Sequence, residues 1–175
     1  GIQSLADLKG RSIAFQNSYS TSSYIMPAAE MLREGLAMDL LLSPLDRPHA
    51  GRSGYVFARS EGNVATWVQK RLVDAGAFSD LDWDALADLP QSFRDELEIF
   101  YEGRSVLRAV EVVAPDLDPV ISERLRQVLL EAENDPLAKE PLARFFGTRG
   151  FFPLDKDAEK GLSDFFSPLV FMLYG

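Results

Sequence analysis

The feature that most constrains this chain is the alternation of short apolar segments with longer segments of helical spacing. Short apolar segments at 11–16, 39–43, 55–58 and 73–78 are interleaved with helical spacing at 24–34 and 61–72. A polar loop, residues 17–22, separates the first of these strands from the helix that follows it. Strands that alternate with helices predict an α/β fold with a mostly parallel sheet flanked by helices.

The second half of the chain has a different character. Pro115 marks the change, and Asp118 is a natural N-cap before Pro119. We expect short helices at 82–87 and 91–96, strands at 97–101 and 106–113, and then helices at 118–133, 136–146 and 157–166. The sequence therefore predicts a sheet-containing first part and a mainly helical second part.

Composition excludes several classes of protein. The 175 residues are 46% hydrophobic, which excludes a disordered chain, and their net charge is −9, which disfavours nucleic acid as a partner. The absence of cysteine excludes disulfides, thiolate metal sites and a cysteine nucleophile. No apolar run approaches about 18 residues, so we expect no membrane span in this sequence.

The start of the sequence carries no sign of a leader. Gly1 stands where a start methionine would be, and neither a basic patch nor an apolar stretch follows it. We therefore expect the native N-terminus, with any signal peptide, to lie outside this sequence.

Residues for catalysis are scarce. His49 is the single histidine, and it lies in a polar, proline-rich loop where solvent exposure is expected. One histidine without cysteine cannot build a histidine-based metal cluster or a catalytic triad, and no glycine motif for nucleotides occurs. We expect a protein that is not an enzyme, with no catalytic residues, no metal and no cofactor.

The polar loop before the 24–34 helix is the strongest candidate for a binding site. Ser20, Thr21 and Ser22 stand where the first turn of that helix presents unpaired N–H groups, and their hydroxyls add further donors. Together these groups would form an anion cradle that needs no formal positive charge. The alternative is a simple N-cap cluster, since serine and threonine are also preferred helix caps. One serine can serve both purposes.

Four segments, in order, resemble phosphate-, phosphite- and phosphonate-type substrate-binding proteins of ABC transporters. The segments are 5–10 with Ser20-Thr21-Ser22; 54–57 with Asn63, 67–68 and 73–77; 89–90 with Arg94 and 106–109; and 115–119 with 129–130, 135–136 and 145–146. Leu107 departs from the pattern, because the family usually has proline there. The resemblance covers nearly the whole chain. At Ser20–Ser22 it favours an oxyanion site over a simple N-cap cluster.

This resemblance implies the type 2 periplasmic binding fold with a partial second lobe. Residues 1–102 would form a complete ligand-binding lobe, and residues 103–175 the hinge return and the C-terminal helical part of the other lobe. Family members are longer at the N-terminus, so the N-terminal part of that other lobe would be missing here. The ligand of the family lies between the lobes.

Further site residues follow from position and from the resemblance. Asp74 lies at the end of a short strand, where ligands of α/β sheets collect, and would face Ser20–Ser22 across the cleft. In relatives that bind aminophosphonates an acid there pairs with the amine. Its alternative is a structural acid at a turn or hinge. Glu61 and Asn63 open the 61–72 helix and would face the same cleft, unless they form a solvated first turn. Tyr19 and Tyr55 are candidates for aromatic walls, with core packing as their alternative.

Two functions from different classes fit these residues. The first is a solute-binding component that captures a small oxyanion, such as a phosphonate or phosphate, for an ABC permease. The second is an extracytoplasmic sensor domain with a signalling partner; an enzyme on the same fold is a weaker third, because the histidines it needs are absent. Either leading function implies a periplasmic or extracytoplasmic location. A chain without its first strands would leave apolar surface uncovered, so we also expect a homodimer of this chain.

Overall fold

The chain forms two compact units. A computed structural model describes residues 1–85, 90–105, 109–145 and 147–163. One unit spans residues 1–105, here called the sheet unit, and the other lies within residues 106–167, here called the helical unit. The division into lobes at residue 102 stays a prediction, as does the assignment of each part to a lobe. Within the described residues, no helix combines the length and the apolar character needed to cross a membrane.

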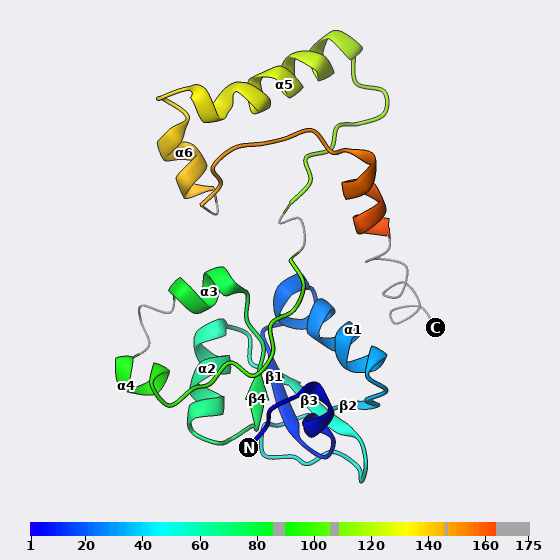
Figure 1. Ribbon diagram of the computed structural model, residues 1–175, viewed down its shortest axis with the longest axis vertical. Coiled ribbons are helices and arrows are strands. Elements are labelled where there is room, and N and C mark those ends of the chain that lie inside the picture. Colours follow the sequence, from blue (N-terminus) through cyan, green and yellow to red (C-terminus); the bar gives the residue numbers. More distant parts are fainter. Residues whose placement is uncertain (86–89, 106–108, 146, 164–175) are drawn as a thin grey trace. The chain divides into compact units, whose positions relative to one another are not determined.

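The sheet unit is built on four parallel strands (Figure 1). Their bounds are β1 Ser12–Phe15, β2 Met38–Leu40, β3 Ser53–Phe57 and β4 Ala75–Gly76, and their order in the sheet is β2-β3-β1-β4. Ile13 of β1 stands opposite Tyr55 of β3 on one side and Ala75 of β4 on the other. The predicted parallel α/β fold is confirmed.

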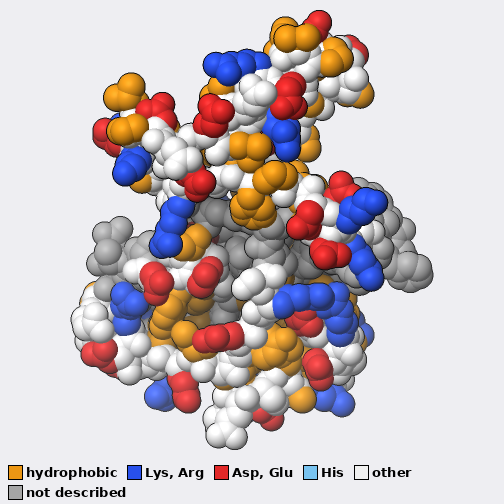
Figure 2. All heavy atoms as spheres, turned by 45° about the horizontal axis from the view of Figure 1, so that its top comes forward, with side chains coloured by type: hydrophobic (Ala, Val, Ile, Leu, Met, Phe, Trp, Pro, Cys, Tyr) orange, Lys and Arg blue, Asp and Glu red, His pale blue; other side chains and the backbone are white. Residues whose placement is uncertain are grey.

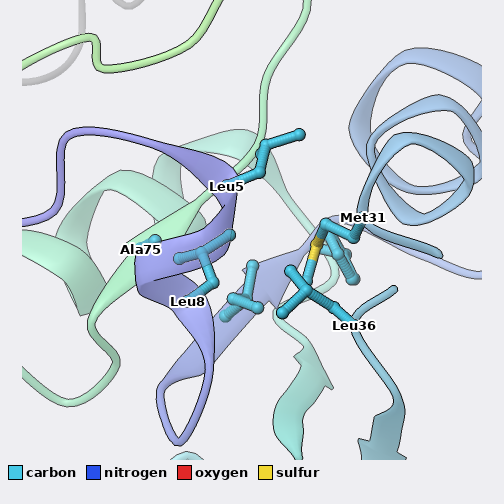
Figure 3. Close-up of a cluster of buried hydrophobic side chains, with 7 residues drawn as sticks. Leu5, Leu8, Met31, Leu36 and Ala75 are labelled. Carbon is cyan, nitrogen blue, oxygen red and sulfur yellow. The ribbon is translucent and has the colours of Figure 1, made fainter. Parts of the chain in front are cut away.

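Side chains of successive β1 residues alternate between two cores, as a strand requires. On one face Ile13 and Phe15 pack under the short helix η1 (Leu5–Leu8) and the helix α1 (Met26–Arg33). Figure 3 shows how Leu5, Leu8, Met31, Leu36 and Ala75 gather in that core. On the other face Ala14 packs with Val56 and with Val64 of α2 (Glu61–Gln69). The sheet is therefore covered on both faces, with α1 and α2 on opposite sides.

The helix ends have local causes. The helix α1 continues from a single π-helical turn, η2 (Thr21–Ile25), and Gly35 ends it with a φ of 78°. The helix α2 ends at Gln69, and Arg71, just after the capping residue, adopts a φ of 57° although it is not glycine. Two short helices follow, α3 (Asp80–Ala85) and α4 (Gln91–Arg94), which pack Trp83 and Phe93 near Ala65 of α2.

The helical unit contains α5 (Pro119–Glu131), the turn η3 (Ala132–Asn134), α6 (Lys139–Arg144) and a helix over 156–163. Asp118 caps α5 as predicted, since its carboxylate accepts the N–H groups of Val120 and Ile121. Among the described residues of this unit, Leu142 is the one buried apolar side chain. Four large hydrophobic side chains of α5 are exposed instead, Val120, Ile121, Leu125 and Val128. Figure 2 shows hydrophobic side chains, in orange, at the surface of the protein.

Two predicted strands are wrong. Residues 97–101 and 109–113 form no regular secondary structure and join no sheet, since no strand within the described parts of the chain pairs with them. The rest of the second prediction, residues 106–108, lies outside the described residues. The predicted helical residues 86–87, 146 and 164–166 also lie outside them.

Candidate functional site

Three helix starts lie at the carboxyl edge of the sheet. The chain leaves β1, β3 and β4 through short loops, and each loop ends in a serine whose hydroxyl caps the next helix. The Ser20 hydroxyl accepts the N–H of Ser23 at 3.1 Å, that of Ser60 accepts the N–H of Asn63 at 3.2 Å, and that of Ser79 accepts the N–H of Asp82 at 3.0 Å.

The strands β1 and β3 differ from the other neighbouring strands in the directions of the connections that follow them. These strands are neighbours, yet the chain runs from β1 into α1 on one face of the sheet and from β3 into α2 on the other. Ligands of open α/β sheets bind where two neighbouring connections diverge in this way. The expected binding position is therefore at the carboxyl ends of β1 and β3.

At the end of β1, one of the three predicted residues caps the helix, and the other two are free to form the predicted anion cradle. Ser20 is the cap, and its carbonyl also accepts the N–H groups of Tyr24 and Ile25 at 3.1 and 2.9 Å. Within the described residues, the N–H groups and hydroxyls of Thr21 and Ser22 have no hydrogen-bond partner, and Thr21 is exposed. These are the groups that an anion would engage.

Ser23 was not among the predicted residues, and it fixes the position of this helix start. Its side chain is buried, with its hydroxyl donating to the carbonyl of Ala77 at 2.8 Å and accepting the N–H of Gln16 at 2.9 Å. The hydroxyl thereby ties the chain after β1 to the chain after β4. A serine directly before an apolar helix face is the signal that could have identified it.

The two candidate tyrosines, Tyr19 and Tyr55, differ in how far they are buried. Tyr19 precedes the cap, and its side chain is 81% exposed, so it does not pack in the core. Tyr55 does pack there, against Phe15, Tyr24 and Phe57. Burial, followed by the hydrogen bond with Tyr55, raises the pKa of Tyr24 to about 12. Of the two, only Tyr19 is available to a ligand at the cradle.

At the end of β3, Glu61 and Asn63 occupy the first turn of α2. The Asn63 side-chain amide donates to the carbonyl of Ala58 at 2.8 Å, which fixes the loop to the helix, and Glu61 is half-buried. Arg59, which was not predicted, adopts a φ of 73° in the same loop, and its N–H donates to the carbonyl of Gln16 at 2.7 Å. Its guanidinium forms no ion pair among the described residues.

The structure does not bring Asp74 to this edge. Asp74 precedes β4, and its carboxylate accepts the N–H and the hydroxyl of Ser12 at 2.8 and 3.0 Å and pairs with Arg11 at 3.2 Å. These contacts lie at the beginning of β1, about 10 Å along the strand from its carboxyl end. The expectation that Asp74 faces Ser20–Ser22 is wrong in geometry, because the strand begins after this residue and does not end at it.

Residues 1–159 match a protein family described as the periplasmic substrate-binding protein of phosphonate ABC transporters. The chain belongs to this family. The predicted resemblance is thereby confirmed, and the family accounts for the parallel sheet covered by helices on both faces.

Solved structures agree with the assignment. Two structures of XAC2383 from Xanthomonas citri, one bound to chloride ion and one bound to ATP, each align with a TM-score of 0.89 and 43% sequence identity over 96% of this chain. The chain spans about 60% of the length of these proteins. No curated protein gave a significant match.

Proposed function

We propose that this chain is the larger part of a solute-binding component that captures a small oxyanion, such as a phosphonate or phosphate, for ABC import. The family supports solute binding, a transporter partner and a location outside the cytoplasm, and it favours import over the sensor alternative. Neither the family nor the described residues favour catalysis.

One observation carries the choice of an oxyanion. Thr21 and Ser22 present two unpaired N–H groups and two hydroxyls at the start of a helical segment that continues to Arg33. The helix dipole adds positive potential at the same place, and the cation of Arg59 lies on the neighbouring loop. The ions in the two XAC2383 structures, chloride and ATP, are both anions, which supports an anion site in this group of proteins.

The overall charge of −9 does not oppose this function. Backbone N–H groups supply partial charge locally, so an acidic protein can hold an anion at a helix start. Tyr19 and Asn63 would border the bound ion, with Glu61 as the acid available to an amine on the ligand. Asp74 has no part in the proposed site.

The test separates the backbone amide from the side chain. Thr21 is the first helical residue and Ser20 before it is extended, with a ψ of 117°, so proline fits at position 21 without breaking the helix. Thr21→Pro removes the N–H and the hydroxyl together, whereas Thr21→Ala and Ser22→Ala each remove one hydroxyl. The assay is calorimetry of the full-length protein with phosphate, phosphite and methylphosphonate.

A hydrogen bond to a charged group is worth about 1.5–3 kcal/mol, so each loss should weaken binding roughly 10- to 100-fold, most strongly for Thr21→Pro. Ser18→Ala is the matched control, because Ser18 is an exposed serine of the same loop. Unchanged affinity of all three variants for every ligand that binds would disprove the cradle.

A further inference from the structure

Arg59 has a backbone conformation that arginine rarely adopts. Its φ is 73°, in the left-handed region that favours glycine, and its side chain is exposed. A residue with a Cβ is strained there, and strain of this kind collects at binding sites and active sites. Glycine would fit the same turn without strain, so the arginine side chain itself needs an explanation.

Hydrogen bonds connect Arg59 to the helix start that carries the cradle. The N–H of Arg59 donates to the carbonyl of Gln16 at 2.7 Å, just past the last pair of β1 and β3. The N–H of Gln16 in turn donates to the hydroxyl of Ser23 at 2.9 Å. Because paired strands lie about 5 Å apart, the backbone of Arg59 is held one strand spacing from the loop that leads into the cradle.

The chain is also fixed on the other side of Arg59. The hydroxyl of Ser60 accepts the N–H of Asn63 at 3.2 Å, and the side-chain amide of Asn63 donates to the carbonyl of Ala58 at 2.8 Å. The backbone on both sides of Arg59 is therefore ordered. An anion bound by its guanidinium would cost little conformational entropy beyond the rotamers of one side chain.

The cradle by itself does not compensate two negative charges. The helix start contributes about half an elementary charge, and the N–H groups and hydroxyls of Thr21 and Ser22 are uncharged. The second charge of a dianion would also be repelled by a protein of net charge −9. Arg59 supplies a full positive charge on the neighbouring loop, and its guanidinium forms no ion pair within the described residues, Glu61 included. The planar guanidinium can bind two oxygens of one tetrahedral anion.

We propose that Arg59 compensates the second charge of the ligand, so that the protein selects a dianion, such as a phosphonate or hydrogen phosphate, over a singly charged oxyanion of the same shape. This inference rests on the proposed function, and it adds the residue and the charge by which the ligand is chosen. The cradle binds any oxyanion, and Arg59 sets the preference among them.

The experiment compares two ligands of the same shape by calorimetry of the full-length protein at mildly alkaline pH. Methylphosphonate is then mostly a dianion, whereas methanesulfonate is a monoanion. The parent should bind methylphosphonate roughly tenfold more tightly or better, and in Arg59→Gly this ratio should fall to about threefold or less. Arg59→Lys keeps the charge without the planar fork and should lie between the two. Ser22→Ala should weaken both ligands alike and leave the ratio unchanged.

Arg71→Gly is the matched control. Arg71 is also an exposed arginine in the left-handed region, with a φ of 57°, but it lies at the other end of α2. Both glycine variants should raise the urea midpoint by roughly 0.5 M, because both relieve the same strain. Only Arg59→Gly should change the ratio of the two affinities, so that its lost selectivity is separated from any loss of folding.

The results separate this inference from the proposed function. If the parent and Arg59→Gly show the same ratio, dianion selection is overturned while oxyanion capture stands. The same holds if Arg59→Lys loses as much selectivity as Arg59→Gly, or if Arg71→Gly loses as much. A parent that binds neither ligand would refute oxyanion capture, and this inference with it.

Discussion

Ser23 is the residue on which the position of the candidate site depends most. Replacing it with alanine removes one hydroxyl and two hydrogen bonds, and leaves the carbonyl of Ala77 and the N–H of Gln16 without that partner. The site is buried, so water cannot easily replace the lost bonds. A buried polar group left unpaired costs about 1–3 kcal/mol, and two such groups predict a loss of about 2–6 kcal/mol in the free energy of unfolding.

Tryptophan fluorescence is the appropriate assay. The protein has two tryptophans, Trp67 and Trp83, and both lie in the sheet unit, so urea unfolding followed by fluorescence reports that unit. For a slope of about 2 kcal/mol per M urea, the midpoint of Ser23→Ala should fall by about 1–3 M.

The matched control is Ser22→Ala. Within the described part of the chain the Ser22 hydroxyl has no hydrogen bond, so its removal should leave the midpoint unchanged. A loss below roughly 0.5 kcal/mol for Ser23→Ala, the scale of an ordinary surface substitution, would refute the role assigned to Ser23.

Three further predictions follow from local geometry. Arg71, just after the end of α2, adopts a φ of 57°, so Arg71→Gly should raise the free energy of unfolding by about 1 kcal/mol in the same urea assay, and an unchanged midpoint would contradict this. Asp39 accepts a hydrogen bond from His49 at 2.8 Å and another from Arg52, which lower its pKa to about 2. Because the pKa of Asp39 is lower in the folded than in the unfolded chain, its carboxylate stabilises the fold at pH values above the unfolded pKa near 4, and this contribution disappears as the pH falls towards 2. Asp39→Asn should therefore flatten the pH dependence of the urea midpoint in this range. An unchanged pH profile would exclude this contribution of Asp39 to stability. The exposed apolar side chains of α5 (Val120, Ile121, Leu125 and Val128) should make the 175-residue chain self-associate in analytical ultracentrifugation, and Leu125→Glu should shift it to monomer. A monomeric parent at high concentration would refute the prediction.

The sequence predicts the sheet unit well because its signals are local. A short apolar strand, a polar turn and a helix ended by glycine each depend on neighbouring residues, and Gly35 ends α1 where expected. The candidate site at Ser20–Ser22 is predicted from the same local signals, and it stays a prediction. Ser60 carries a comparable signal, a serine three residues before Asn63 at a helix start, but a single serine is a weaker sequence signal than three successive hydroxyl residues.

Pairing between distant segments could not be predicted in this way. Asp74 was placed at the end of a strand, but β4 has only two residues and begins after it, and its register against Ser12 is set by contacts 62 residues apart in the chain. The segments 97–101 and 109–113 have strand composition, yet composition supplies no ladder partner. Both errors concern partners that lie outside the local sequence.

The most direct test of the central claim is an amide titration. Methylphosphonate is added to the ¹⁵N-labelled full-length protein, and backbone amide shifts are followed by NMR. If unpaired N–H groups at the end of β1 bind the oxyanion, the amide signals of Thr21 and Ser22 should show the largest saturable shifts, while those of Asp74 and Ser12 stay in place. Saturable shifts that leave Thr21 and Ser22 unmoved would contradict the account.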